Sequence, residues 1–129
     1  FKKRKRIIKP TTMKNYLIDI DGTISEDIPN EESERFLFAE VLPGAKEQCN
    51  KWYDEGHTIT FFTAREEKHR DATEIWLNMN NFRYHKLLMN KPRGGNYHWI
   101  DNLSVQATRF DGKWSDLVKK TKTIETFES

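Results

Sequence analysis

A chain of 129 residues, 36% of them hydrophobic and 33% charged, is long enough to bury one core and predicts a single globular domain. No apolar run approaches the length of a membrane span, and the N-terminus lacks the apolar stretch of a signal peptide. We therefore expect a cytoplasmic protein without a membrane partner. Cys49 is the only cysteine, which excludes an intramolecular disulfide and a cysteine-based zinc site.

Positive charge is concentrated at the N-terminus. The net charge of +2 comes from 22 basic and 20 acidic residues, but seven of the bases lie in residues 1–14, which contain no acid. The remaining 15 bases face all 20 acids, so residues 15–129 carry a formal charge of −5. We expect residues 1–12 to be a solvated, disordered arm, or a stretch ahead of a start at Met13, and residues 13–129 to form the domain. An acidic body makes nucleic acid an unexpected partner.

The first half of the chain predicts a strand, a flap and a helix, in that order. Residues 16–20 form an apolar run that is typical of a buried strand in a sheet covered on both faces. Residues 24–42 are acidic and then amphipathic without a single period, which indicates a flap with one helical turn. Residues 43–56 predict a helix, because Pro43 suits its start and Gly56 suits the left-handed cap after its end. Its apolar face consists of Ala45, Cys49, Trp52 and Tyr53.

A second strand and a second helix follow. Residues 57–63 form another buried strand, which ends near Thr63. Residues 66–80 predict a helix, because apolar side chains recur at the spacing i, i+3, i+4, i+7. That stripe consists of Ala72, Ile75, Trp76 and Met79.

The last third of the chain predicts two more strands. Residues 85–90 read as a short third strand, and residues 97–101 as a fourth strand that ends on Asp101. A hairpin or short strand is expected near residues 105–110, and a short helix over residues 115–122.

Alternation of strands and helices predicts an α/β fold with a mostly parallel central sheet flanked by helices. In such sheets, ligands bind outside the carboxyl ends of the strands. Asp19 and Asp21 follow the first strand, Thr63 ends the second and Asp101 ends the fourth, so all four are expected at one edge.

Four short motifs give these residues a common interpretation. "DIDGT" from Asp19, "FFTAR" around Thr63, "NKP" around Lys91 and "WIDN" around Asp101 resemble the motifs of haloacid dehalogenase (HAD) superfamily phosphatases. The resemblance implies a Rossmann-like HAD fold. The gaps between the motifs are too short for a cap domain. The stretch "NKPRGGNYHWIDN" from Asn90 resembles short capless phosphatases of bacterial capsule and surface-polysaccharide sugar phosphates.

The resemblance also implies catalytic roles. Asp19 is the nucleophile that forms an aspartyl-phosphate, and Asp21 is the general acid and base. Mg²⁺ would be bound by the carboxylates of Asp19 and Asp101 and by the backbone carbonyl of Asp21, because Mg²⁺ prefers oxygen ligands. Thr63 would donate a hydrogen bond to a phosphoryl oxygen, and Lys91 would offset negative charge. Lys86 competes for this last role, but the proline after Lys91 and its distance to Asp101 favour Lys91.

Residues near these motifs are candidates for binding substrate. Arg65 and Arg93 lie in loops at the expected active edge, where each is either a grip for a second anionic group or sugar hydroxyls, or an idle surface arginine. Asn102 stands where many relatives carry a second acid, which predicts weaker metal affinity. The candidate substrate-binding residues are Gly22, Thr23, Ala64, Arg65, Arg93 and Asn102.

Three functions remain open at this stage. The first is an Mg²⁺-dependent phosphomonoester hydrolase acting on a sugar phosphate or a related small metabolite, with a homo-oligomer closing the capless site. The second is a nucleotide or polynucleotide-end phosphatase whose basic arm holds the strand. The third is a phosphate- or metal-binding module without turnover. The purely structural interpretations are that "DGT" is only a turn with a capping threonine and that Asp101 only caps a helix.

Overall fold

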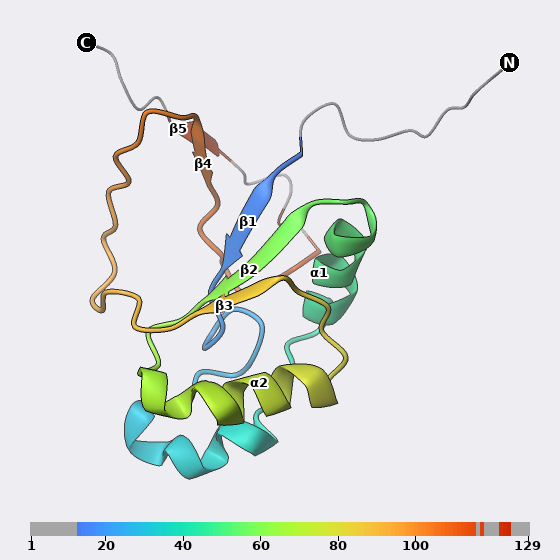
Figure 1. Cartoon of the computed structure of the whole chain (residues 1–129), viewed down its shortest axis with the longest axis vertical. Helices are drawn as coiled ribbons and strands as arrows, with labels where there is room; N and C mark the ends of the chain where they lie inside the picture. Colours follow the sequence, from blue (N-terminus) through green and yellow to red (C-terminus); the bar gives the residue numbers. More distant parts are fainter. Residues whose placement is uncertain (1–12, 116, 118–121, 125–129) are drawn as a thin grey trace, which may run out of the picture.

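The computed structural model describes residues 13–115, 117 and 122–124, so the predicted arm of residues 1–12 lies outside the described residues. A three-stranded parallel sheet lies at its centre, with strand order β1-β2-β3 (Figure 1). The strands are β1 (Asn15–Ile18), β2 (Thr58–Phe62) and β3 (Lys86–Leu88). The predicted α/β class and parallel sheet are therefore confirmed.

The sheet buries one of its two faces. Ile18, Phe61 and Leu87 lie side by side across the three strands and are all buried. On the opposite face, Leu17 is 43% exposed and Leu88 is 42% exposed. The expectation of a sheet covered on both faces is thus wrong at its edge strands, because the helices of the described residues pack where the alternating side chains of Ile18 and Phe61 point.

Helix α1 (Ala45–Asp54) follows its prediction closely. Gly44 takes the N-cap position with a φ of 85°, so Pro43 precedes the cap and does not occupy the first turn. Cys49 and Trp52 are buried against the sheet, and Tyr53 is partly buried. Gly56 has a φ of 99°, as a left-handed residue after the helix requires.

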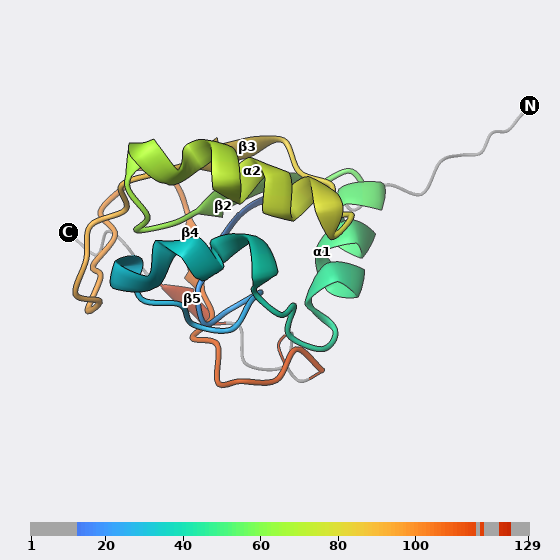
Figure 2. The same cartoon turned by 90° about the horizontal axis from the view of Figure 1, so that it is seen from below.

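The flap contains more helix than the sequence predicts. A 3₁₀ helix, η1 (Asn30–Phe38), has nine residues and a kink at Glu32, where φ is −113° and ψ is 39°. Phe36 is its fully buried side chain, whereas Phe38 is 80% exposed. η1 packs against α2 (Arg70–Met79), which is preceded by a short 3₁₀ turn, η2 (Glu67–His69) (Figure 2).

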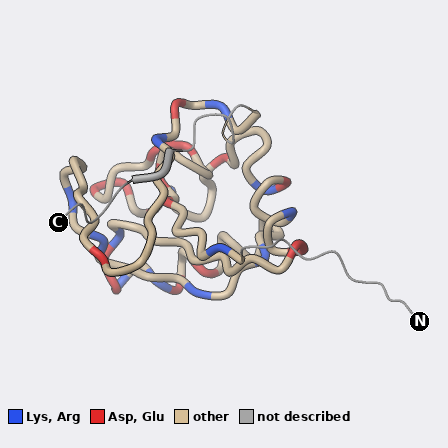
Figure 3. Tube along the Cα trace, turned by 90° about the horizontal axis from the view of Figure 1, so that it is seen from above, with Lys and Arg blue, Asp and Glu red and all other residues tan. Residues whose placement is uncertain are grey.

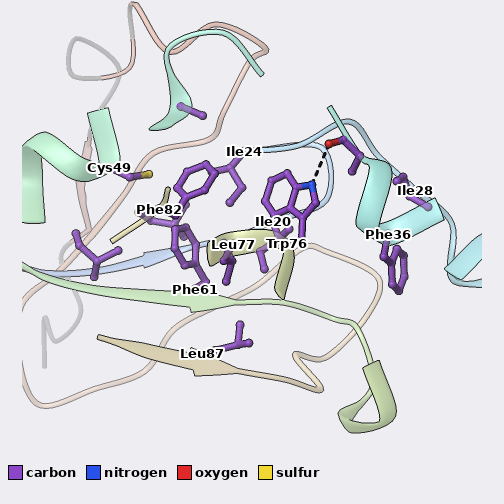
Figure 4. Packing of buried hydrophobic residues seen from close by; sticks show 14 of the residues in the cluster. Ile20, Ile24, Ile28, Phe36, Cys49, Phe61, Trp76, Leu77, Phe82 and Leu87 are labelled. Atoms are coloured by element: carbon purple, nitrogen blue, oxygen red, sulfur yellow. Dashed lines mark hydrogen bonds between the residues drawn. The ribbon is translucent and has the colours of Figure 1, made fainter. Parts of the chain in front are cut away.

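The buried face of α2 differs from the predicted stripe. Thr73, Trp76 and Leu77 are fully buried, whereas Ile75 and Met79 are 48% and 62% exposed. The helix is rotated because its inner side faces both the sheet and η1, where the Trp76 Nε1–H donates to the Ala39 carbonyl over 2.9 Å (Figure 4). Trp76 and Trp52 are core residues, as predicted.

The predicted fourth strand is absent from the described residues. Residues 97–101 have no regular structure, and Trp99 and Ile100 are 46% and 76% exposed. A strand requires a hydrogen-bonded neighbour, and local propensity does not supply one. The next strand is β4 (Val105–Ala107), which pairs antiparallel with β5 (Lys122–Ile124).

The remaining expectations concern insertions and the C-terminus. Between β1 and β3, the described chain holds only η1, α1, η2 and α2 beside β2, so this stretch contains no cap domain. The predicted helix over residues 115–122 falls largely on residues 116 and 118–121, which lie outside the described residues, and Lys122 begins β5. Among the described residues, no helix has the length and apolarity needed to cross a membrane.

Candidate active site

A pocket of about 240 Å³ opens at the carboxyl ends of the three parallel strands. Four segments form its walls: the turn after β1, the start of the flap, the chain after β2 and the loop after β3. The lining residues are Asp19, Asp21, Asp27, Ile28, Pro29, Asn30, Ala64, Arg65, Lys91, Arg93, Gly94 and Tyr97. This is the edge at which α/β sheets bind ligands.

The turn after β1 presents two carboxylates to this pocket. Ile20 is fully buried, and its carbonyl accepts the N–H groups of Thr23, Ile24 and Ser25 over 3.0, 2.9 and 3.2 Å. Gly22 allows the chain to turn with a φ of 80°. Ile20 thereby anchors the turn in the core.

Asp19 is paired with Lys91. The Lys91 Nζ lies 3.4 Å from Asp19 Oδ1, and the Thr23 hydroxyl donates to Asp19 Oδ2 over 3.3 Å. Burial raises the pKa of Asp19 above its ordinary value, and the nearby Lys91 ammonium opposes this rise without cancelling it. The Lys91 ammonium also lies 5.0 Å from the ring centroid of Tyr97, within the range of a cation–π interaction.

Asp21 is held by a buried arginine. Arg65 Nε donates to Asp21 Oδ2 over 2.9 Å, and Arg65 Nη2 donates to Asp21 Oδ1 over 2.8 Å. The side chain of Arg65 is 1% exposed and that of Asp21 is 19% exposed. The prediction of Arg65 as a loop residue at the active edge is right about its place. The structure shows its side chain buried and paired with Asp21, and not exposed for contact with a substrate.

Thr63 lies under the site and not on its wall. It is fully buried, and its Oγ1 accepts the N–H of Arg65 over 3.1 Å. Its backbone joins the ends of β2 and β3, because Thr63 N–H donates to Leu88 O and Thr63 O accepts Lys91 N–H, each over 2.9 Å. Thr63 therefore positions Arg65 and Lys91, and its contact with a phosphoryl oxygen stays a prediction.

The fourth motif, around Asp101, does not lie at the pocket that the other three motifs form. Asp101 Oδ2 accepts the Trp99 Nε1–H over 3.0 Å, and Oδ1 accepts the Leu103 N–H over 3.1 Å. These hydrogen bonds lower the pKa of Asp101. Neither Asp101 nor Asn102 lines the pocket, so the expected convergence is wrong for this motif because residues 97–101 form no strand beside β1.

The remaining predicted binding residues divide into two groups. Ala64 and Arg93 line the pocket, and Arg93 Nη2 donates to the Ala64 carbonyl over 3.2 Å. Gly22 and Thr23 do not line it, but they shape and support the turn that carries Asp19.

The side chains fit Mg²⁺ only in part. Within the described residues, no group of three or more His, Cys, Asp or Glu side chains is arranged to hold a metal ion. Mg²⁺ commonly binds one or two carboxylates together with substrate phosphate and water. Asp19 can provide such a carboxylate. Both side-chain oxygens of Asp21 accept hydrogen bonds from Arg65, which do not involve its backbone carbonyl, the ligand that the sequence predicts. The donor set thus fits an ion held by the Asp19 carboxylate, substrate and water, and the Asp21 carbonyl stays a predicted ligand.

Sequence reasoning missed three residues that shape the site. Phe36 covers the guanidinium of Arg65, Thr73 accepts a hydrogen bond from it, and Tyr97 faces Lys91. Thr73 directly follows Ala72 but lies outside the predicted apolar stripe, so the helical period did not single it out. No sequence pattern distinguished Phe36 from the neighbouring Phe38.

Comparisons with known proteins agree with this architecture. The chain matches the family described as "PITM 1-3, LNS2 domain" over residues 16–100, which is more than half of its length. The LNS2 domain has a HAD-like fold, so the predicted fold is confirmed. No curated protein sequence matches the chain.

Solved structures show the same fold at low sequence identity. A structural-genomics target from Vibrio cholerae superimposes with a TM-score of 0.53 and 20% identity, covering 69% of this chain and 80% of the other. A chain of a Pnkp1/Rnl/Hen1 complex matches with a TM-score of 0.55 and 22% identity over 76% of this chain and 34% of its own. A Pnkp1/Rnl/Hen1 RNA repair complex matches with a TM-score of 0.55 and 20% identity, covering 73% of this chain. This chain spans about a third of the length of those last two matches.

Proposed function

Because the chain belongs to the family of PITM 1-3 LNS2 domains, which have a HAD-like fold, we propose that its pocket hydrolyses phosphomonoesters. The observation that carries this proposal is the meeting of Asp19 with Lys91, 3.4 Å apart, beside the paired Asp21 and Arg65. The pocket thus presents a nucleophile and the Lys91 ammonium to a dianionic phosphate, beside a second carboxylate that Arg65 holds.

The chemistry assigns a separate task to each carboxylate. Asp19 attacks phosphorus while the ester P–O bond breaks, which gives an aspartyl-phosphate. Asp21 donates a proton to the departing oxygen, then takes one from the water that cleaves the aspartyl-phosphate. Lys91 offsets negative charge at the pocket, since an unscreened carboxylate repels a phosphate dianion, whereas the charge of Arg65 balances that of Asp21.

The proposal includes dependence on Mg²⁺. Bound at Asp19, the ion would neutralise the phosphate and orient it toward the carboxylate. The Asp19 carboxylate carries this part of the proposal, because it lines the pocket, where the Lys91 ammonium lies 3.4 Å from Oδ1 and the Thr23 hydroxyl 3.3 Å from Oδ2.

A phosphate-release assay tests the proposal. 4-Nitrophenyl phosphate and a panel of sugar phosphates are incubated with Mg²⁺ or with EDTA, and Asp19→Asn is compared with the wild type. Mg²⁺-dependent turnover that Asp19→Asn abolishes supports the proposal. The matched control is Asp27→Asn, a carboxylate of the same pocket that forms no ion pair with Lys91 among the described residues. No release from the activated aryl ester, together with retained phosphate binding, favours a binding module without turnover.

For the substrate of this phosphatase, we propose a sugar phosphate or a related small metabolite. It rests on the resemblance of the sequence motifs to capless phosphatases, on the absence of a cap between β1 and β3 and on a pocket of about 240 Å³. Arg93 is exposed on the rim, where its guanidinium can reach a sugar hydroxyl or a second anionic group. Substrate preference within the phosphate panel decides this point.

A second candidate substrate is a nucleotide or the phosphorylated end of a polynucleotide. Tyr97 favours it, because this aromatic side chain lines the pocket and is 55% exposed, and such rings stack on nucleobases. The charge pattern does not, because Lys and Arg are interspersed with Asp and Glu along the described trace (Figure 3). A 3′- or 5′-phosphorylated oligonucleotide in the same assay, with Tyr97→Ala as the variant, separates the two candidates.

A further inference from the structure

A buried cation lies beneath the turn that carries the two carboxylates. The side chain of Arg65 is 1% exposed, and a guanidinium in such a place is costly unless protein groups satisfy its charge and its N–H groups. The other arginine that lines the pocket, Arg93, is exposed by contrast. Arg65 therefore differs from a substrate-binding arginine, whose guanidinium is exposed in the pocket of the free protein.

Two of its contacts fix the Asp21 carboxylate. The bonds from Nε to Oδ2 and from Nη2 to Oδ1 measure 2.9 and 2.8 Å, which is the paired arrangement of a planar guanidinium with a planar carboxylate. Such a pair sets both the plane and the direction of the carboxylate. A single ammonium in the same place would leave the carboxylate free to rotate.

The guanidinium is itself fixed by two elements outside the sheet. Arg65 Nη1 donates to Thr73 Oγ1 of α2 over 2.9 Å, and the Thr73 hydroxyl donates to the His69 carbonyl over 2.8 Å. The ring of Phe36 in the flap lies 3.8 Å from Arg65 Cζ. The direction of Asp21 is thus linked to α2 and to the flap.

We propose that Arg65 is the positioning residue for Asp21, and that the flap and α2 aim Asp21 at the leaving-group oxygen through it. This inference rests on the proposed function. In the step concerned, Asp21 starts as the carboxylic acid, with its proton on a lone pair that the Arg65 N–H groups do not use. The bond from Asp19 to phosphorus forms as the ester P–O bond breaks, the bonding electrons leave with the ester oxygen, and the Asp21 proton goes to that oxygen, which leaves Asp21 as the carboxylate paired with Arg65. A poorly stabilised alkoxide needs this proton, whereas 4-nitrophenolate leaves without it.

Dependence on the leaving group therefore provides the test. We measure kcat/KM for an alkyl ester, glycerol phosphate, and for 4-nitrophenyl phosphate with wild type, Arg65→Lys, Asp21→Asn and the double variant. Arg65→Lys keeps the charge but loses the paired geometry. We expect it to lose about 10²-fold or more on the alkyl ester, the usual scale of acid–base catalysis, and far less on the aryl ester. The double variant should be no worse than Asp21→Asn, because both changes remove the same proton transfer.

Two further variants separate positioning from folding. Thr73→Val frees one end of the guanidinium but leaves the ion pair, so it should show a smaller loss that is again selective for the alkyl ester. Arg83→Lys is the matched control, because Arg83 pairs with Asp54 over 2.7 Å on an exposed surface, and it should leave both rates unchanged. If Arg65→Lys does not fold, Thr73→Val decides alone.

The possible outcomes separate a failure of the positioning role from a failure of the proposed phosphatase activity. Equal losses on both esters in the folded Arg65→Lys and Thr73→Val variants would overturn the positioning role while leaving the phosphatase intact. Additive losses in the double variant would do the same. Failure of the wild type to hydrolyse either ester would overturn the proposed function itself.

Discussion

Phe36 offers the sharpest test of how the flap is held over the site. Its side chain is fully buried and packs in the core cluster (Figure 4). It also lies 3.8 Å from the guanidinium of Arg65. Phe38 is two residues away in the same 3₁₀ helix and is 80% exposed. The two phenylalanines therefore form a matched pair in which burial is the main difference.

Truncation of a buried phenylalanine to alanine costs about 3–5 kcal/mol. Loss of a desolvated cation–π contact accounts for about 2 kcal/mol. We therefore expect Phe36→Ala to lower the free energy of unfolding by about 4 kcal/mol, with Phe36→Leu, which keeps most of the volume, near about 2 kcal/mol. Phe38→Ala should stay within about 0.5 kcal/mol of wild type, as exposed positions usually do.

Urea unfolding followed by tryptophan fluorescence measures these values, because Trp76 and Trp52 are buried. With an m-value of about 2 kcal/mol/M, a loss of about 4 kcal/mol moves the midpoint by about 2 M. A loss below about 1 kcal/mol for Phe36→Ala, or equal losses for Phe36→Ala and Phe38→Ala, would refute the packing of the flap against Arg65.

Three further predictions concern single groups. Without Mg²⁺, burial raises the pKa of Asp19 above the ordinary range of aspartate, which an NMR titration of the metal-free protein follows. Lys91→Gln removes an opposing positive charge and should raise that pKa further, so a lower pKa in the variant would contradict the pairing. Asp101→Asn should leave kcat/KM near wild type, and a loss as large as that of Asp19→Asn would instead show that the fourth motif reaches the pocket. Burial raises the pKa of Cys49 to about 12, so iodoacetamide should label it only after unfolding, as peptide mass spectrometry can follow; rapid labelling of the native protein would contradict its burial.

Much of the fold could be predicted from local patterns in the sequence. β1, β2 and β3 lie where apolar runs of strand length occur, and α1 lies between a proline and a left-handed glycine. These signals are local, because hydrophobic period and turn chemistry act over a few residues. Asp19, Asp21 and Lys91 could be placed at one edge for a similar reason, since parallel strands present their carboxyl ends together.

Tertiary structure alone decided which groups became partners. Residues 97–101 have the composition of a strand but remain exposed, because strand formation depends on a neighbour's backbone and not on the segment's own side chains. The buried face of α2 was set by η1, which packs on it and covers Trp76. Arg65 reads in the sequence as a loop residue, yet it is buried.

The sequence by itself determined that two carboxylates end a buried strand and that a threonine and a lysine follow the next two strands. It did not determine what balances those charges. Asp21 is 44 residues from Arg65 along the chain, and Arg65 is held by Phe36 and Thr73 from two other elements. Such contacts arise only when separate elements pack, because the partner of a buried charge is chosen by three-dimensional proximity and desolvation, neither of which is encoded in local spacing.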